Sequence, residues 1–198
     1  MISSILISIA FVIGIFVGIA GMLPGGIIPQ ALAGYVLYAL IFFVGISVGA
    51  NVKIWKTVKK MHFKIALVPM SVVIGTLSGA GVFSLFLSTI TLPQALAIGS
   101  GFGYYSLSSV IIAQLDGEAL GTIALISNLM REIVTILAAP FFAHYFGRLA
   151  PIAAGGATSM DTTLPVITKY SGNEYTIISI FSGMVLTFLV PMLVPIFL

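Results

Sequence analysis

The residues best suited to chemistry lie in the middle of an apolar run. Residues 125–137, LISNLMREIVTIL, carry Arg131 and Glu132 side by side within a segment hydrophobic enough to cross a membrane. An ionisable side chain that faces lipid at mid-membrane costs about 2.5 to 3.5 kcal/mol on insertion scales. Both side chains are therefore expected to face protein or water, where a carboxylate can bind a proton or a cation.

Polar neighbours at helical spacing support this expectation. Asn128 lies one turn before Glu132, Ser127 lies one turn before Arg131, and Thr135 continues the stripe. Adjacent positions on a helix point about 100° apart, so Arg131 and Glu132 are expected to have separate partners. Glu132 is predicted to be functional and Arg131 to be a fixed counter-charge, because a guanidinium keeps its proton. The alternative is a structural ion pair that holds helices together.

Two glycine-interrupted segments flank this stretch, ALAIGSGFGYYSLSSVIIAQL and LAPIAAGGATSMDTTLPVITKY. Glycines let a membrane helix break, and the freed backbone and hydroxyl groups can bind a ligand, as in many transporters. Asp161 is expected to contact substrate directly or to cap a half-helix. The candidate site residues from these segments are Gly103, Ser106, Ser108, Ser109, Gly155, Gly156, Thr158, Ser159, Asp161 and Thr162.

The two segments resemble each other and form a candidate inverted repeat. GYYSLSSV, from Gly103, aligns with GATSMDTT, from Gly156, with glycine and serine matched. If each segment enters and returns on one side, Arg148 and Lys169 both fall in the cytoplasm, as the positive-inside rule requires. Broken helices that cross only half of the membrane would place Arg148 and Lys169 on the same side. Small and hydroxyl residues are also common at ordinary membrane helix contacts.

The composition predicts an all-α polytopic membrane protein. The 198 residues are 60% hydrophobic and 7% charged, and about seven hydrophobic segments follow one another with short polar intervals. The whole chain, 1–198, is predicted to be a single transmembrane domain. Residues 1–90 would form three spans with a basic loop at 51–64. Residues 91–198 would form a core in which interrupted segments at 92–115 and 149–170 surround a span at 121–143.

Charge predicts the orientation of the chain in the membrane. Five of the eight basic residues lie in the loop at 51–64, which is therefore expected to be cytoplasmic and to attract anionic lipid. The amino terminus would then be cytoplasmic and the carboxyl terminus outside. No nucleic-acid partner is expected.

No enzyme class is indicated. The chain has no zinc-binding helix, nucleophile elbow, phosphate-binding loop or dinucleotide fingerprint. No catalytic residue, cofactor or metal site is therefore expected.

The strings GFGYYSLSS, NLMREI and GGATSMDTTLPVI, in this order and hydropathy frame, resemble the LysO family of bacterial lysine exporters. The resemblance covers essentially the whole chain. It implies a bacterial or archaeal cytoplasmic-membrane protein that expels L-lysine and analogues, with Glu132 matching the family's acid in its carboxyl-terminal part. Family members resembling this chain usually carry an additional amino-terminal membrane segment with another acid at membrane depth. We therefore expect a split exporter with a small membrane partner subunit, or a homo-oligomer.

The resulting hypothesis is a proton antiporter. One carboxylate cannot hold a proton and an ammonium group together, so Glu132 would alternate between them. The alternatives are a passive channel subunit and a non-transporting membrane scaffold, while an intramembrane enzyme ranks last.

Overall fold

In the computed structural model, residues 63–198 are described, together with scattered single positions between 13 and 46. The chain divides into two compact units, Met1–Val36 and Leu37–Leu198. The account below concerns residues 63–198, all within the second unit. The predicted first two spans lie outside the described residues except for those single positions, and the basic loop lies outside them up to residue 62.

Within the described residues, three helices are long and apolar enough to cross a membrane. They are α4 (Leu67–Ser84), which follows the short 3₁₀ helix η1 (Phe63–Ala66), α7 (Glu118–Tyr145), and the run Asn173–Phe197, which contains η3 (Asn173–Tyr175) and α10 (Thr176–Phe197). The span predicted at 121–143 is therefore extended by three residues at its start and two at its end.

Shorter helices occupy the two glycine-rich segments. The first contains α5 (Leu92–Gly99) and α6 (Tyr105–Asp116), and the second contains α8 (Ala150–Gly155), η2 (Gly156–Met160) and α9 (Leu164–Ser171). We call the connection at residues 100–104 the first break and residues 155–163 the second break.

Local sequence signals explain where α5 begins. Thr91 and Gln94 form a capping box, in which the Thr91 hydroxyl accepts from the Gln94 amide and the Gln94 side chain accepts from the Thr91 amide. Pro93 lies in the first turn, where its missing N–H has no cost. The sequence therefore specified this helix start directly.

Polar contacts join the two ends of each glycine-rich segment. The Gln94 side chain, at the start of α5, donates to the Asp116 carboxylate at the end of α6 over 2.7 Å. Arg148, just before α8, forms a 3.1 Å ion pair with Glu174, just after α9. These contacts bring the two ends of each segment close together.

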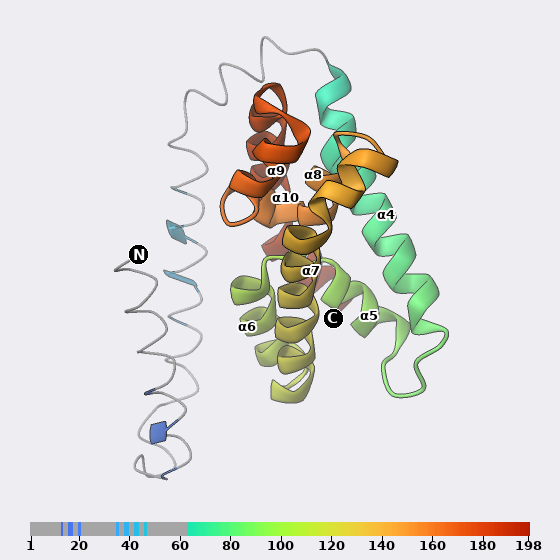
Figure 1. The fold of residues 1–198 in the computed structure, drawn as a ribbon. Helices are drawn as coiled ribbons and strands as arrows, with labels where there is room; N and C mark the ends of the chain where they lie inside the picture. The colour runs from blue at the N-terminus through green and yellow to red at the C-terminus, as the bar shows by residue number, and fades with distance from the viewer. Residues whose placement is uncertain are drawn as a thin grey trace. The chain divides into compact units, whose positions relative to one another are not determined.

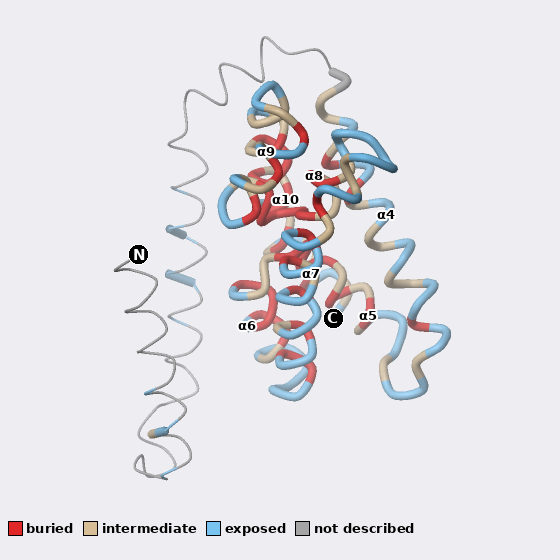
Figure 2. The backbone as a smooth tube through the Cα atoms, in the orientation of Figure 1, coloured by how far each residue is buried: buried red, intermediate tan, exposed pale blue. Residues whose placement is uncertain are grey.

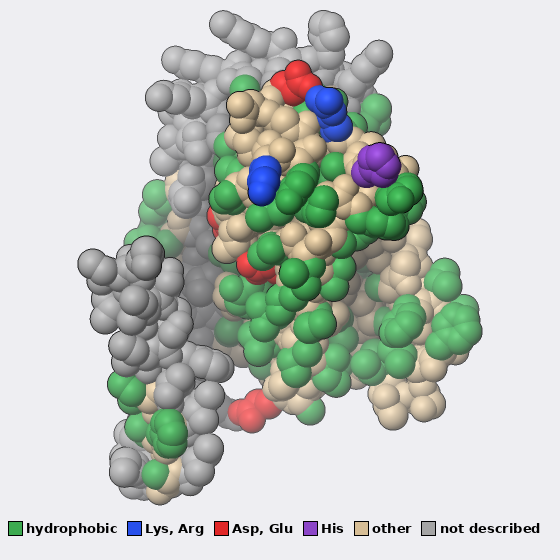
Figure 3. Space-filling model, in the orientation of Figure 1, with side chains coloured by type: hydrophobic (Ala, Val, Ile, Leu, Met, Phe, Trp, Pro, Cys, Tyr) green, Lys and Arg blue, Asp and Glu red, His purple; other side chains and the backbone are tan. Residues whose placement is uncertain are grey.

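The helices of this unit pack around α7 and α10. In Figure 1, α5 and α6 lie beside the lower half of α7, while α8 and α9 lie toward its upper end. Buried residues concentrate where the breaks meet the middle of α7 (Figure 2). In Figure 3, hydrophobic side chains cover the middle of the visible face, and its Lys and Arg side chains lie higher up. An apolar outer surface of this kind suits a lipid environment.

Candidate functional site

The site is built on one face of α7. The buried residues of this helix recur at helical spacing and are Leu120, Gly121, Ala124, Asn128, Glu132, Thr135 and Ala139. Three of the predicted polar-stripe residues thus face the protein. Arg131 lies at the edge of this face and is half-buried, while Ser127 is exposed.

Asn128 attaches α7 to the first break. Its side-chain amide donates to the Ile98 carbonyl of α5 at 3.1 Å and to the Ala124 carbonyl at 3.0 Å. Its Oδ1 atom accepts from the Gly103 amide at 2.7 Å. The side chain therefore supplies an acceptor for the Gly103 amide in the first break and adds a donor to the Ile98 carbonyl, which also accepts from the Gly101 amide.

Arg131 attaches α7 to the end of α8. Its Nε and Nη2 atoms donate to the carbonyls of Ala154 and Ala153 over 2.8 and 3.0 Å, and Nη1 donates to the Thr76 hydroxyl of α4 over 3.1 Å. The carboxyl-terminal carbonyls of a helix carry partial negative charge, which a guanidinium offsets. The prediction of separate partners for Arg131 and Glu132 is confirmed for Arg131.

The two breaks touch each other beside these residues. The Ala157 amide donates to the Phe102 carbonyl over 2.8 Å. Gly103 and Gly156 both have positive φ angles, +94° and +62°. A Cβ atom on Gly156 would collide with the Phe102 carbonyl, and one on Gly103 would lie 3.1 Å from the Gly155 carbonyl oxygen. Glycine is therefore needed here for conformation and for close approach.

Glu132 is buried on the inner face of α7, one turn after Asn128. It is only 8% exposed, and its Oε2 atom has no hydrogen-bond partner among the described residues. Leaving a buried polar atom unsatisfied costs about 1 to 3 kcal/mol. This oxygen is available to carry a proton or to accept a hydrogen bond from a ligand.

Asp161 lies at the exposed side of the second break. Its Oδ1 atom accepts from the Thr162 amide over 2.6 Å. The expectation that Asp161 is the N-cap of a half-helix is wrong, because Thr163 occupies the N-cap position of α9, whereas Asp161 lies at the C-cap position of η2. The Tyr105 phenol lies within electrostatic range of the carboxylates of both Glu132 and Asp161.

Glu132 and Asp161 have no basic partner at ion-pair distance in residues 63–198, where the ion pair found joins Arg148 to Glu174. A cation that reached either carboxylate would therefore displace no ion-paired basic side chain in this part of the chain.

The predicted hydroxyl residues divide into two groups. Thr158 and Ser159 are buried and donate to the carbonyls of Gly155 and Gly156, so their hydroxyls stabilise the second break. Ser108 likewise donates to a backbone carbonyl, that of Tyr104, and Ser109 is buried beside it. Ser106 and Thr162, by contrast, are exposed and belong to the outer side of their segments.

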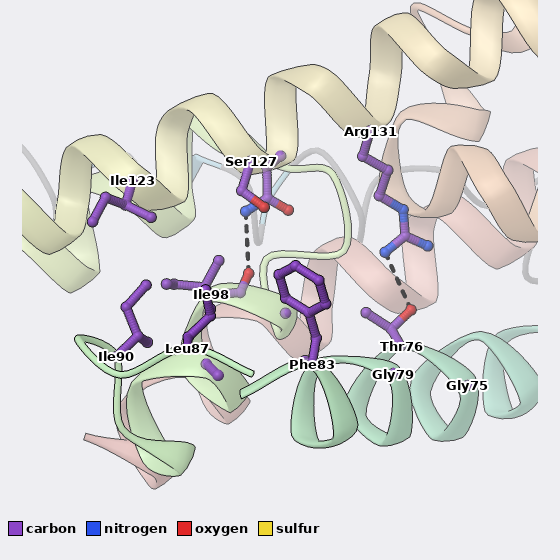
Figure 4. Close-up of a pocket in the computed structure, with 14 residues that line it drawn as sticks. Gly75, Thr76, Gly79, Phe83, Leu87, Ile90, Ile98, Ile123, Ser127 and Arg131 are labelled. Carbon is purple, nitrogen blue, oxygen red and sulfur yellow. Dashed lines mark hydrogen bonds between the residues drawn. The ribbon is translucent and has the colours of Figure 1, made fainter. Parts of the chain in front are cut away.

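A cavity of about 560 Å³ lies between α4, α5 and α7 (Figure 4). Its polar lining comes from Thr76, Ser127, Asn128 and Arg131, and the rest is mainly apolar. Glu132 is not among the lining residues, so the cavity lies on the Arg131 side of α7. No cluster of three or more possible metal ligands occurs in the described part of the chain.

Sequence reasoning missed three residues in contact with the site. Phe102 is fully buried and has a positive φ of 46°, a strained conformation for a bulky residue. Its position between Gly101 and Gly103 was the available signal. Tyr105 was read only as part of the repeat, and nothing local in the sequence marked Thr76 as the partner of Arg131.

The chain is similar to known proteins over most of its length. Residues 8–198 match the family described as Lysine exporter LysO. The chain belongs to this family. It is 41% identical over 166 residues to the "Putative lysine exporter" of Haemophilus influenzae (strain ATCC 51907 / DSM 11121 / KW20 / Rd). This match covers 82% of each of the two chains.

The chain is also 33% identical over 186 residues to "Lysine exporter LysO" of Escherichia coli (strain K12). This match covers 94% of the present chain and 61% of the Escherichia coli protein. No solved structure matches. Membership of the LysO family, together with the apolar helices, makes the chain a multi-pass membrane protein of a transporter family rather than an enzyme.

Proposed function

We propose that this LysO-family chain exports L-lysine and related cationic amino acids by exchange for protons, with Glu132 as the exchange site. The family and both named relatives are described as lysine exporters, which supports the substrate class. The observation that carries the exchange mechanism is the buried Glu132 carboxylate, with one oxygen left without a partner in the described residues.

Glu132 is suited to exchange because proton and ammonium compete for one carboxylate. Arg131, although adjacent in sequence, donates its hydrogen bonds to α8 and α4 rather than to Glu132. The carboxylate is therefore free to bind an incoming cation. Entry of a proton would neutralise it, release the ammonium group of lysine, and couple export to the proton gradient.

Asp161 is proposed as a second, more accessible contact for the cation. L-lysine carries two ammonium groups and one carboxylate. The Tyr105 phenol lies within electrostatic range of both carboxylates. We propose that Glu132 and Asp161 attract the ammonium groups while backbone groups of the breaks, with nearby hydroxyls, bind the polar remainder.

The two glycine-rich segments are proposed to be re-entrant, discontinuous helices in inverted orientation. The Gln94–Asp116 and Arg148–Glu174 contacts support this proposal, because they hold the two ends of each segment together. The breaks then meet near the middle of α7, the depth at which transporters bind substrate. Arg148 and Lys169 would face the cytoplasm and the carboxyl terminus the outside, in the cytoplasmic membrane of a bacterium or archaeon.

A small membrane partner subunit, or a second copy of the chain, is proposed to complete the exporter. The match covers 61% of the Escherichia coli relative, so part of that protein lies outside the aligned region. Co-purification from the native membrane, followed by identification of any small protein with an intramembrane acid, tests this part. A chain that exports lysine at full rate as a purified monomer would contradict it.

The central test is the conservative removal of charge at Glu132. In proteoliposomes loaded with labelled lysine, and containing any membrane protein that co-purifies, an inward proton gradient should accelerate efflux. Glu132→Gln should abolish this exchange. Glu118→Gln, an exposed acid in the first turn of the same helix, is the matched control and should behave as wild type.

Each rival function predicts a different result in the same experiment. A channel subunit would pass lysine down its electrochemical gradient without any dependence on protons. A scaffold would show no flux, and Glu132→Gln would only lower the amount of inserted protein. Normal proton-driven exchange by Glu132→Gln would reject Glu132 as the exchange site.

A further inference from the structure

The contacts of α7 with the breaks point to a role for two polar residues other than ligand binding. Asn128 is hydrogen-bonded to Ile98, just before the first break, and to Gly103, within it. Arg131 holds the carbonyls of Ala153 and Ala154, immediately before the second break. These side chains lie three positions apart on one helix, so a single turn of α7 fixes both breaks.

The breaks are also fixed to each other. The hydrogen bond from Ala157 to Phe102 joins them directly. Glycines let the α7 side chains approach: a Cβ atom on Gly101 would lie 2.6 Å from Asn128 Nδ2, and one on Gly156 would lie 3.1 Å from Arg131 Nη2. Both breaks and this turn of α7 therefore form one closely packed polar cluster.

The Arg131 guanidinium makes three hydrogen bonds within the protein. Two donors reach α8 and one reaches Thr76 of α4, past the cavity between α4 and α7 (Figure 4). Replacement by lysine would keep the charge but lose the planar fork that makes these contacts simultaneously.

We propose that Asn128 and Arg131 are positioning residues that hold the two breaks as one unit against Glu132, rather than ligands of the transported amino acid. Asn128 lies one turn from Glu132 on the same buried face. The position of the two breaks along α7 therefore decides which of their backbone groups face the Glu132 carboxyl. This proposal rests on the proposed export function, because one of its two tests measures the rate of lysine exchange. Its stability measurement, however, is independent of that function.

The first test separates positioning from binding. Arg131→Lys should lower the maximal rate of lysine exchange at least tenfold per inserted molecule and leave the KM for lysine within about twofold. Thr76→Val removes one of the three contacts and should retain most of the rate. A large rise in KM with an unchanged maximal rate would overturn the proposal, since it would mean that Arg131 binds substrate.

The second test uses a double-mutant cycle on thermal unfolding in detergent. If Asn128 and Arg131 stabilise one unit, the fall in unfolding temperature for Asn128→Ala with Arg131→Lys should be clearly smaller than the sum of the single falls. Additive falls would overturn the proposal. This cycle remains informative if Glu132→Gln exports normally, so failure of the exchange hypothesis and failure of this proposal can be told apart.

Discussion

Arg131 and Glu132 are adjacent in sequence but have different surroundings in the site. Arg131 places three donors on protein oxygens and stabilises the end of α8. Glu132 is buried, and one of its oxygens has no partner in the described residues. The 100° turn between neighbouring helix positions accounts for this separation. The guanidinium thus stabilises the fold, and the titratable carboxyl remains available for the proposed exchange.

Asp161 provides a prediction at the residue scale. Asp161→Asn should keep the turn, because the amide oxygen can still accept from Thr162, but it removes the negative charge. Loss of one charge-assisted contact of about 1.5 kcal/mol would raise the KM for lysine roughly tenfold. Initial rates of exchange against lysine concentration measure this.

Thr162→Ala is the control for Asp161→Asn. Its backbone amide still donates to Asp161, so the charge is retained and the KM should change by less than about threefold. A KM for Asp161→Asn equal to that of wild type would mean that Asp161 does not contact the substrate.

The interrupted segments depend on glycines whose surroundings exclude a side chain. Gly156 combines a positive φ with direct contact to the Phe102 carbonyl. The strained backbone of Phe102 is in turn held by the Ala157 hydrogen bond. Strain of this kind persists only where surrounding contacts determine the conformation. Each break therefore depends on the other.

Gly156→Ala gives a prediction at the element scale. The added methyl group would meet the Phe102 carbonyl, and the left-handed conformation is itself unfavourable for alanine. We expect a loss of at least about 2 kcal/mol in stability, seen as a lower unfolding temperature of the solubilised protein.

The matched control for Gly156→Ala is Gly79→Ala in α4, where no atom lies within 4 Å of the added Cβ. This variant should be neutral or slightly stabilising, because alanine is the better helix former. Equal losses for the two variants would contradict the close packing of the breaks.

At the scale of the whole molecule, the ends of the two glycine-rich segments lie at opposite ends of α7. Glu118 begins α7 near the end of α6, whereas Glu174 is paired with Arg148, which follows the end of α7. If α7 crosses the membrane, these two acids lie on opposite sides of it. The proposed orientation places Glu174 in the cytoplasm.

The absence of cysteine from the sequence makes this orientation testable. Single variants Glu118→Cys and Glu174→Cys introduce thiols at two exposed positions. In intact cells a membrane-impermeant maleimide should label Glu118→Cys and not Glu174→Cys, and permeabilised cells should show labelling of both. The reverse pattern in intact cells would invert the proposed topology.

Two features of the protein followed from the sequence without the structure. Composition predicted an all-helical membrane protein, and the polar spacing in α7 predicted a buried face carrying Asn128 and Glu132. These features depend on local geometry, periodicity and solvation, which act over one or two helical turns.

Only the tertiary structure decided how these elements meet. Arg131 contacts Thr76, which lies 55 positions away, and α8, which lies 22 to 23 positions away. The two breaks meet through the hydrogen bond between Phe102 and Ala157. The sequence offered Asp161 as the N-cap of a half-helix, but Thr163 occupies the N-cap position of α9. Local patterns show that a polar group needs a partner, but packing between distant helices selects which one it receives.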